Sequence, residues 1–358
     1  MRLHFIRDIK KSGKPCRPFD GTKCYVDTGS VSGTNISNAT EVDFADKPSR
    51  ANVSASVGDV LFAKMQGTTK VLLINNELSS NIYSTGFYAF KDPRIEPGFL
   101  RHFFLSPGFN MEKDRLSKGA TMKAINDDGM AQISISVPSL SRQKEITAEL
   151  DAIEKSIKLS NAQISLLDYQ VKSLFNEMFG QPGINEKGYP MVSLGDLAKS
   201  INYGTSKPAV KDGKTPYLRM GNMTDDGRID LSDLKYITLD GNEYEKSVVR
   251  DGDFLFNRTN SREHVGRSVA FHEKQEMIIA GYIIRVRLDQ TKVETDYLSA
   301  FMNSLYMKKN LFNMAKGAVN QANINAKEMA AIKLFLPPLE LQAEFVEKKN
   351  QIDKLRFI

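Results

Sequence analysis

Residues 139–178 read SLSRQKEITAELDAIEKSIKLSNAQISLLDYQVKSLFNEM, and the rest of the chain is organised around them. Apolar side chains recur there in a 4-3-4-3 spacing that only Ser160 interrupts, at Ile146, Leu150, Ile153, Ile157, Ile164, Leu167, Val171, Leu174 and Met178. This spacing predicts a coiled-coil helix whose apolar stripe, or seam, needs a partner helix to bury it. At about 1.5 Å per residue the helix would be a rod of about 60 Å, long enough to act as a spacer.

Length and composition limit the class of protein. A chain of 358 residues with 41% hydrophobic content can form two or three domains with real cores. The sequence has neither a membrane-length apolar run nor a signal peptide, so we expect a cytoplasmic protein with no membrane partner. Cys16 and Cys24 are the only cysteines, and the four histidines are scattered, so we expect free thiols and no metal site.

The positive charge is concentrated on either side of the predicted helix. Residues 1–138 contain 18 Lys and Arg against 14 Asp and Glu, and residues 181–336 contain 22 against 19. Residues 139–180 contain 5 against 6, and the net charge of the whole chain is +6. Two separated basic regions fit a polyanion that is contacted twice, although many proteins carry this charge without binding nucleic acid.

The two flanking regions are copies of one unit. SVGDVLFAKM (56–65) matches RDGDFLFNRT (250–259), and ISVPSLSRQKEI (135–146) matches LFLPPLELQAEF (334–345). CYVDTGSVSGTNI (24–36) resembles PYLRMGNMTDDGRI (216–229), and FIRDI at Phe5 resembles SLGDL at Ser193. Matches in the same order at a nearly constant offset indicate a duplicated globular domain, each copy followed by a helix.

Each copy is predicted to have an α+β fold. Short β-branched and aromatic segments predict strands at VLFAKM (60–65), KVLLIN (70–75), DFLFNR (253–258), SVAFHE (268–273) and MIIAGYIIRVRL (277–288). Helices are predicted at Pro97–Leu105 and Asp296–Asn313, and proline marks the entry to each terminal helix. We therefore expect domains at 1–138 and 181–336, the long helix at 139–180 and a shorter C-terminal helix at 337–358.

These features together resemble the specificity subunit of type I restriction-modification systems over essentially the whole chain. The resemblance is carried by the repeated Gly-Asp strand (Gly58-Asp59 and Gly252-Asp253), GAVNQANI (317–324), LPPLELQ (336–342) and the helix exit LFNEMFGQPGINEKGYPMVSLGDLA (174–198). It implies two target recognition domains, each reading one half of a split double-stranded DNA sequence. It also implies that the helices dock two methyltransferase subunits, that restriction subunits are further partners, and that the chain has no catalysis or cofactor of its own.

The C-terminal helix departs from this pattern. It has about 20 residues instead of about 40, and Lys349 and Arg356 occupy positions where its seam would need apolar side chains. We expect Phe345 and Ile352 to bury only one end of the central stripe. The rest would be left for methyltransferase helices or for a second copy of the protein.

Polar loops after the Gly-Asp strands are the first candidates for DNA contact, because base edges are read by Arg, Lys, Asn, Gln, Ser and Thr. In the second domain the loop offers Asn257, Arg258, Asn260 and Arg262, and its counterpart in the first domain offers Lys64, Gln66, Thr68, Thr69 and Lys70. The alternative is that both are ordinary solvated hairpin loops. Their duplication at one framework position favours a function.

Two glycine-containing loops are the second candidates, because Lys-Gly-Ala lets the backbone approach a phosphate closely. They carry Lys118, Thr121 and Lys123 in the first domain and Lys316, Asn320, Gln321 and Asn323 in the second. Each could instead be a helix-terminating turn that leads into a strand. A third region of the second domain offers Tyr203, Thr205, Lys207, Arg219 and Asn222.

Two other classes of function remain open. A stand-alone modification or cleavage enzyme would need a methyltransferase tetrapeptide, a phosphate-binding loop or a nuclease motif, and the sequence contains none of them. FGQPG (179–183) follows a helix instead of a strand, so we interpret it as a linker. A coiled-coil scaffold that assembles proteins and ignores DNA is the alternative that needs no such motif.

Overall fold

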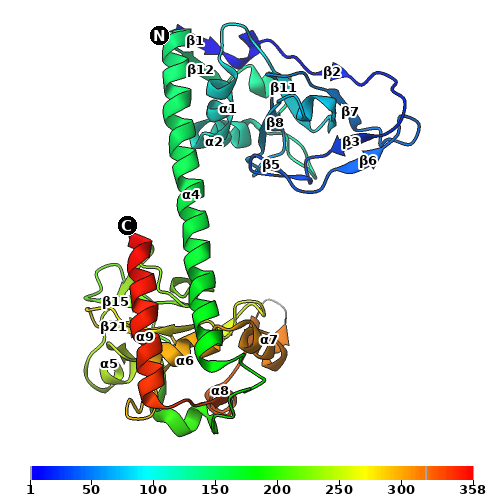
Figure 1. The fold of residues 1–358 in the computed structure, drawn as a ribbon. Helices are drawn as coiled ribbons and strands as arrows, with labels where there is room; N and C mark the ends of the chain where they lie inside the picture. Colours follow the sequence, from blue (N-terminus) through cyan, green and yellow to red (C-terminus); the bar gives the residue numbers. More distant parts are fainter. Residues whose placement is uncertain (1, 319–320, 358) are drawn as a thin grey trace. The chain divides into compact units, whose positions relative to one another are not determined.

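The computed structural model describes residues 2–318 and 321–357, and the chain forms two compact units, Met1–Leu159 and Ser160–Ile358. Both units mix short strands with helices, which confirms the predicted α+β class. One helix, α4 (Leu140–Phe179), belongs to unit 1 in its first half and to unit 2 in its second (Figure 1). The long helix is therefore present where the heptad spacing predicts it.

Unit 1 is built on the strand that follows its Gly-Asp step. Its helices are α1 (Pro97–Leu105), α2 (Pro107–Leu116) and α3 (Asp127–Met130), with short 3-10 turns at Ile6–Asp8 and Leu78–Ser80. Its strands are β1 (Arg2–Phe5), β2 (Lys14–Pro15), β3 (Lys23–Val26), β4 (Val31–Ser32), β5 (Asn35–Ile36), β6 (Thr40–Val42), β7 (Ala51–Ser54), β8 (Val60–Ala63), β9 (Val71–Leu73), β10 (Ile82–Ser84), β11 (Phe87–Phe90) and β12 (Ser134–Val137).

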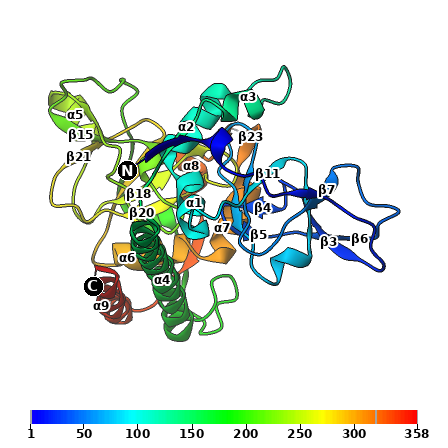
Figure 2. The same cartoon turned by 90° about the horizontal axis from the view of Figure 1, so that it is seen from above.

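Strand β8 is buried on both faces, as its uninterrupted apolar run requires. It forms a three-stranded sheet in the order β11-β8-β9. On one face Phe62 packs against Phe104 of α1 and Phe109 of α2, with ring centroids 4.6 and 5.1 Å apart. On the other face Leu61 and Ala63 join a second apolar cluster. A separate sheet in the order β2-β7-β10-β3-β6 lies at the end of unit 1 remote from α4 (Figures 1 and 2).

Unit 2 repeats this design. Its strands are β13 (Met191–Ser193), β14 (Ala198–Tyr203), β15 (Thr215–Leu218), β16 (Lys235–Ile237), β17 (Val248–Val249), β18 (Phe254–Asn257), β19 (Thr259–Asn260), β20 (Ser268–Ala270), β21 (Met277–Ile279), β22 (Ile283–Leu288), β23 (Lys316–Ala318), β24 (Gln321–Asn323) and β25 (Lys333–Phe335). Its helices are α5 (Gly241–Ser247), α6 (Thr295–Met302), α7 (Leu305–Met314), α8 (Ala326–Ala330) and α9 (Leu339–Lys354), with 3-10 turns at Leu194–Leu197, Met220–Asn222 and Leu355–Phe357.

Equivalent residues make equivalent contacts in the two units, which supports the internal repeat. The Asp59 carboxylate accepts a hydrogen bond from the Ser56 backbone, and Asp253 accepts one from Arg250. Tyr25 pairs with Ile82 in a parallel register, and Tyr217 pairs with Ile278 in the same way. The pairs β1–β12 and β13–β25 close the two units. The four-stranded sheets of unit 2 have the orders β14-β22-β18-β20 and β16-β15-β21-β17.

Two element predictions were wrong in detail. The predicted helix Asp296–Asn313 is two helices, α6 and α7, because the Ser304 hydroxyl caps the start of α7 at the Met307 backbone and the Asn303 side chain binds Ser268. The segment 277–288 is two strands, β21 and β22, in different sheets. The chain turns between them, where the Gly281 backbone donates to the Thr205 carbonyl. Apolar periodicity continues across both breaks, so it could not reveal them.

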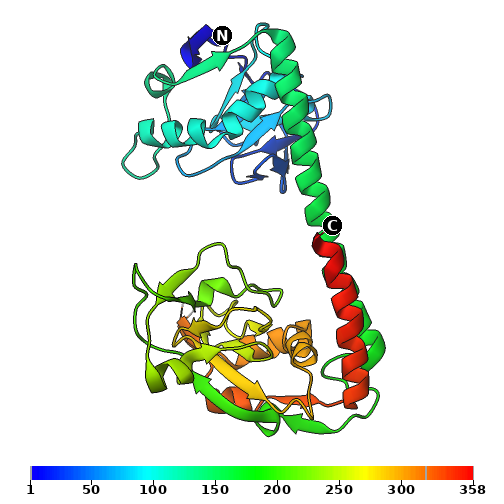
Figure 3. The same cartoon turned by 90° about the vertical axis from the view of Figure 1, so that its left-hand side faces the viewer.

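The short helix α9 lies antiparallel to the second half of α4 within unit 2 (Figure 3). Phe345 is fully buried and its ring lies 5.5 Å from Phe175 and 5.4 Å from Phe179. At the other end of α9, Arg356 pairs with Asp168 of α4 at 2.7 Å. As expected, only one end of the stripe is covered: Leu167 is buried, Ile164, Val171, Leu174 and Ile352 are half-buried, and Leu150, Ile153 and Ile157 are exposed; Ile146 is half-buried in unit 1.

Candidate nucleic-acid interface

The two candidate loops of each unit lie side by side, although the sequence separates them. In unit 1 the Ile125 backbone donates to the Lys64 carbonyl at 3.0 Å, and Gln66 donates to the Lys123 carbonyl at 3.0 Å. In unit 2 the Ile324 backbone donates to the Arg258 carbonyl at 2.9 Å. There β19 pairs with β24, and β24 pairs with β23, in one small sheet. Both units therefore join the loop after the Gly-Asp strand to the glycine-containing loop.

At the junction of these loops each unit holds a cation against a tyrosine ring. The Lys64 ammonium lies 4.0 Å from the centroid of Tyr88, and the Arg258 guanidinium carbon lies 4.8 Å from the centroid of Tyr203. Lys64 and Arg258 occupy equivalent positions, but Tyr88 comes from β11 and Tyr203 from β14. A cation over an aromatic face is held in place without neutralising its charge.

In unit 1 the loop after the Gly-Asp strand is held by the side chain of Lys113, which lies outside the predicted site residues. Lys113 is 1% exposed, and its ammonium donates to the carbonyls of Met65 and Thr68. Burial lowers the pKa of Lys113, and the charge of Asp114 opposes this shift. Its place on the buried side of α2, four residues after Phe109 and three before Leu116, was the available signal.

The predicted unit 1 residues divide into anchored and exposed groups. Thr68 donates to the Met65 carbonyl at 2.8 Å, and Lys70 donates to the Thr28 carbonyl at 2.6 Å. Burial lowers the pKa of Lys64, while Asp127 raises it. The exposed members are Gln66, Thr69, Lys118, Thr121 and Lys123. The Gln66 amide still donates to the Asp114 carbonyl at 3.3 Å, so within the described residues only the other four present free side chains to a ligand.

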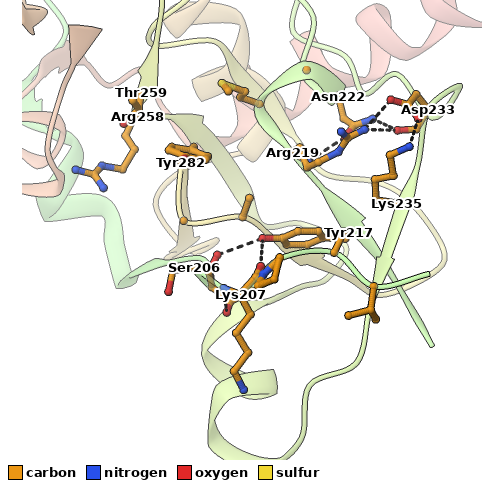
Figure 4. Close-up of a pocket in the computed structure, with 18 of the residues that line it drawn as sticks. Ser206, Lys207, Tyr217, Arg219, Asn222, Asp233, Lys235, Arg258, Thr259 and Tyr282 are labelled. Atoms are coloured by element: carbon orange, nitrogen blue, oxygen red, sulfur yellow. Dashed lines mark hydrogen bonds and ion pairs between the residues drawn. The ribbon is translucent and has the colours of Figure 1, made fainter. Parts of the chain in front are cut away.

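In unit 2 the junction of the two loops borders a cleft of about 1340 Å³ (Figure 4). Its lining gathers all three candidate regions of this unit, including Thr205, Lys207, Arg219, Arg258, Lys316 and Asn323. The segment after β14 and the end of β15 meet there because β15 pairs with β21 and Thr205 bridges to Ala280, directly after β21. The Gly-Asp loop and the glycine-containing loop join them because β19 pairs with β24 and the Arg258 backbone donates to the Tyr282 carbonyl. The sequence indicated these regions separately, and the fold brings them into one cavity.

Most cations of the cleft are paired with acids. Lys207 lies 2.6 Å from Glu243, Arg219 lies 2.8 Å from Asp233, and Lys316 lies 2.6 Å from Glu328. Hydrogen bonds from these cations lower the pKa of each of the three carboxyl groups. All three pairs are exposed enough to be weak and salt-dependent, so a polyanion can replace the carboxylates.

Arg258 differs from its neighbours in this cleft. Among the side chains that the structure describes, which exclude those of residues 317–321, its guanidinium has no ion-pair or hydrogen-bond partner, and its Nε atom is buried like that of Arg219. Figure 4 places it across the cavity from the paired Arg219 and Asp233. Tyr282, 48% exposed, also lines the cavity and was missed because a single tyrosine within an apolar run gives no signal.

Three predicted contacts, two amides and one hydroxyl, are corrected by burial. Asn257 is 0% exposed and its amide lies 3.5 Å from the Met220 carbonyl. Asn222 is 3% exposed, donates to the carbonyls of Asp230 and Asp233, and accepts from the Arg219 backbone. Both amides hold the framework because their strand and turn fold inward, and neither can reach a base. Thr205 is 5% exposed and bonds Glu243.

The remaining predicted residues of unit 2 lie on the rim or outside the described structure. Asn260 accepts a hydrogen bond from the Ser261 backbone, and Arg262 stacks on Phe312 and donates to its carbonyl. Thr259 donates to Asn323 at 3.5 Å. Asn320 lies outside the described residues, and of Gln321 only the backbone, in β24, is described.

One cluster among the described residues has metal-ligand geometry. His102 on α1 and Asp151 and Glu154 on α4 bring ligand atoms within 4.8 Å of one another. Arg101 already pairs with Glu154 at 2.5 Å, and Lys158 lies 3.0 Å from the same carboxylate. The carboxylates thus have cationic partners, and we assign no metal to them. No helix of the described chain is long and apolar enough to cross a membrane.

Comparison with known proteins gives one consistent family. The family described as "Type I restriction modification DNA specificity domain" matches residues 8–168 and again residues 186–357. The specificity subunit of the type I restriction enzyme EcoKI from Escherichia coli K12 is 25% identical over 274 residues, which cover 72% of this chain and 59% of that protein. The StySPI specificity subunit from Salmonella potsdam is also 25% identical, over 72% of this chain and 58% of its own length. The chain thus spans less than two thirds of either relative.

Solved structures share the fold. The S subunit of a type I restriction-modification system from M. genitalium has a TM-score of 0.55 and 12% identity, with 99% of this chain and 91% of that chain covered. A chain from a study of complex assembly and conformational transition of the type I R-M system has a TM-score of 0.51 and 23% identity, covering 99% and 90%. At these identities the likeness concerns the fold alone.

Proposed function

Because this chain belongs to the family of type I restriction-modification DNA specificity domains, we propose that it is the sequence-reading subunit of a DNA methyltransferase complex. Each unit binds one half of a bipartite double-stranded DNA target. Methyltransferase subunits dock on the helices, restriction subunits join the assembly, and the chain itself contributes no catalytic group. The complex acts in the cytoplasm, on the DNA of the cell that makes it.

The observation that carries this proposal is the duplicated loop pair with its tyrosine-held cation. Lys64 and Arg258 lie at equivalent positions of the repeat, each directly after a buried strand. A buried strand gives a rigid base for the side chains that follow it, as specific recognition requires. Because the loops differ in sequence while the frameworks agree, the two half-sites should differ in sequence.

Within each interface the residues divide by chemistry. Exposed lysines such as Lys118, Lys123 and Lys316 suit phosphate contacts, which need charge but no fixed geometry. Gln66 and Thr69 in unit 1, and Arg258, Asn260 and Asn323 in unit 2, suit base edges. Tyr203 and Arg262 are further candidates at the edge of unit 2. The phosphate contacts should account for most of the salt dependence of binding.

The uncovered part of the α4 stripe suits protein partners. Leu150 is 37% exposed, and Ile153 and Ile157 are each 56% exposed. Apolar side chains in a row at heptad spacing are stabilised by a further helix. We assign this stripe to methyltransferase subunits, two per chain, as the duplicated recognition domains suggest.

The direct test is to express the chain together with its methyltransferase subunit and to map methylated bases across the host genome. We expect one motif with two specified parts separated by an unspecified spacer. A continuous motif, or a methylation pattern that does not depend on this chain, would contradict the proposal.

Charge variants give a matched control. Lys118→Glu with Lys123→Glu should weaken DNA binding by the complex for all sequences and flatten its salt dependence. Glu112→Lys with Arg115→Glu exchanges the charges of a surface ion pair on α2 and should leave DNA binding unchanged. Binding that is insensitive to sequence in the unmodified complex would favour the scaffold alternative.

A further inference from the structure

Arg258 is held in a fixed orientation, and no side chain that the structure describes offers its guanidinium an acceptor. Its guanidinium lies over the Tyr203 ring at 4.8 Å, its Nε is buried, and its backbone is locked from both sides. The Arg258 backbone N–H donates to the Tyr282 carbonyl at 2.9 Å, and its carbonyl accepts from Ile324 at 2.9 Å. Since Nε is enclosed, only the terminal amino groups can reach a ligand. They form a planar two-pronged donor.

We propose that Arg258 recognises a guanine in the half-site bound by unit 2, donating two hydrogen bonds to its O6 and N7 atoms. This rests on the proposed function of the chain and deepens it, because it names the base that this cleft selects. Guanine is the base that presents two acceptors together in the major groove. Adenine presents one acceptor and one donor there, so it would leave an arginine amino group unpaired.

The surroundings of Arg258 favour a base over a phosphate as its ligand. Four other cations of the cleft, Lys207, Arg219, Lys235 and Lys316, pair with acids. Lys211 lines the cleft without an ion pair among the described residues, but it is exposed and is not held on an aromatic ring as Arg258 is. The Lys316 side chain is 79% exposed, which suits a phosphate at the rim. Arg258 lines the cavity beside Thr259 and Asn323, two side chains that can also pair with base edges. A phosphate can also accept both prongs of an arginine, but it does so in many orientations and along the whole backbone. A planar base edge accepts them in one orientation only, which suits a donor that is held in place.

Tyr203 acts here as a positioning residue. Its ring supports the guanidinium, and its hydroxyl accepts a hydrogen bond from the Ala326 backbone at 3.0 Å, at the start of α8. The tyrosine therefore ties β14 to the exit of the glycine-containing loop, on which Arg258 also rests. Replacing it should free Arg258 to rotate without removing its charge.

Unit 1 lacks this arrangement at the equivalent position. Lys64 carries a compact charge with no planar fork, and Tyr88 beneath it donates its hydroxyl to Asp127. Lys11 pairs with the same carboxylate at 2.5 Å. Lys64 thus faces an acid within its own unit and suits a less specific contact. The guanine assignment applies to unit 2 alone.

The test uses the assembled complex of chain and methyltransferase, with duplexes that carry the mapped motif. Each guanine is replaced in turn by 7-deazaguanine, which lacks the N7 acceptor, and affinity is measured for the wild type and Arg258→Ala. At one position we expect a loss of about tenfold to a hundredfold for the wild type, the size of one hydrogen bond to a charged group, because the O6 acceptor remains. Arg258→Ala should be insensitive to the replacement at that same position.

Three further variants separate orientation from charge. Arg258→Lys should lose the discrimination at that position, Tyr203→Leu should reduce it, and Tyr203→Phe should retain most of it. Arg250→Lys is the matched control, because Arg250 pairs with Glu245 and Glu276 on the surface and does not line the cleft. Methylation mapping with the same variants should show the other half-site unchanged.

Specific outcomes would overturn the assignment. One is a bipartite motif in which no single guanine behaves as expected. In that case no position would show a loss of affinity on 7-deazaguanine replacement that is present in the wild type and absent in Arg258→Ala. Another is an Arg258→Ala complex that loses affinity equally for all sequences, with a salt slope reduced by about one, because this would make Arg258 a phosphate contact. Both leave the bipartite motif intact, so they are distinguishable from a failure of the proposed function.

Discussion

Unit 1 and unit 2 share a framework but differ in how they hold the helix that follows them. In both, a glutamine at the helix start is fully buried and makes three hydrogen bonds to backbone groups. Gln143 binds Glu96, Arg94 and Pro138, and Gln342 binds Glu294, Lys292 and Pro337. Three residues further on, the equivalents are Ile146, which is half-buried, and Phe345, which is fully buried. The repeat thus conserves the join between domain and helix, while the packing of the helix is specific to each copy.

The largest expected effect is a difference in stability between variants that truncate Phe345 of α9 and Ile146 of α4. Phe345→Ala should destabilise unit 2 by about 3–5 kcal/mol, because it leaves a cavity among Phe175, Phe179 and Tyr297. Ile146→Ala should cost unit 1 much less, about 1 kcal/mol, since its side chain is only half-buried. Denaturant unfolding with hydrogen exchange resolved by residue measures both. Equal losses in the two variants would contradict the difference drawn between the units.

The shared glutamine join is tested by Gln143→Leu and Gln342→Leu. Each substitution leaves three backbone groups, most of them part-buried, without their partner, at a cost of about 3 kcal/mol for the whole set. We expect nearly equal losses of unfolding free energy, each confined to the unit that carries the change. Ser141→Ala, at an exposed site of α4, is the control with little expected effect. A large loss in only one unit would mean that the join is not equivalent.

Polar pairs replace the apolar seam at the end of α9. The Arg356 side chain is 7% exposed and pairs with Asp168 of α4 and Asp353 of α9. Arg356→Ala should cost about 2 kcal/mol by leaving Asp168 and Asp353 without this cation, whereas Arg356→Met should cost less than 1 kcal/mol because it restores apolar packing. Thermal unfolding of the two variants compares them. An Arg356→Met protein less stable than Arg356→Ala would show that the ion pair, and not packing, holds this end.

A second charged contact of α9, made by Asp296, gives the stability of unit 2 a dependence on pH. The residue of unit 1 that corresponds to Asp296 is Gly98, which has no side chain to make such a contact. His272 bonds Asp296 at 2.7 Å, and Asp296 also pairs with Lys349 of α9 at 3.0 Å. The hydrogen bond to Asp296 raises the pKa of His272 to about 9. Burial raises the pKa of Asp296, but His272 and Lys349 outweigh it and lower that pKa to about 2.

The sign follows from the raised histidine pKa. The stabilisation is fully present below the unfolded pKa of about 6.5 and is lost as the pH rises through about 9. Because the His272 side chain is 51% exposed, solvent screening limits the effect to about 1 kcal/mol. The difference in unfolding free energy between pH 6 and pH 9.5 should shrink in His272→Gln. An unchanged difference would place the pH dependence elsewhere.

Much of the framework could be predicted from the sequence because its signals are local. Helix α1 begins and ends where the sequence places it, since Pro97 follows a Glu96 cap that accepts from the Phe99 backbone. The break between α6 and α7 was missed because the apolar spacing continues through Ser304. The candidate site was predicted as separate loops, and its interior could not be predicted. Asn257 and Asn222 look like base-reading amides in the sequence, yet both are buried in the framework.

The sequence by itself determined the duplication, the long heptad helix and the short, partly polar partner helix, because repeats and periodicity are properties of neighbouring residues. Only the tertiary structure decided which cations are free to recognise a ligand. Lys316 and Lys207 find acids from other segments, Lys113 is buried under a loop, and Arg258 is held on Tyr203 without an acid beside it among the described residues. The burial of a cation and its neutralisation by an acid depend on contacts between segments that are distant in the sequence, so composition and local patterns cannot predict them.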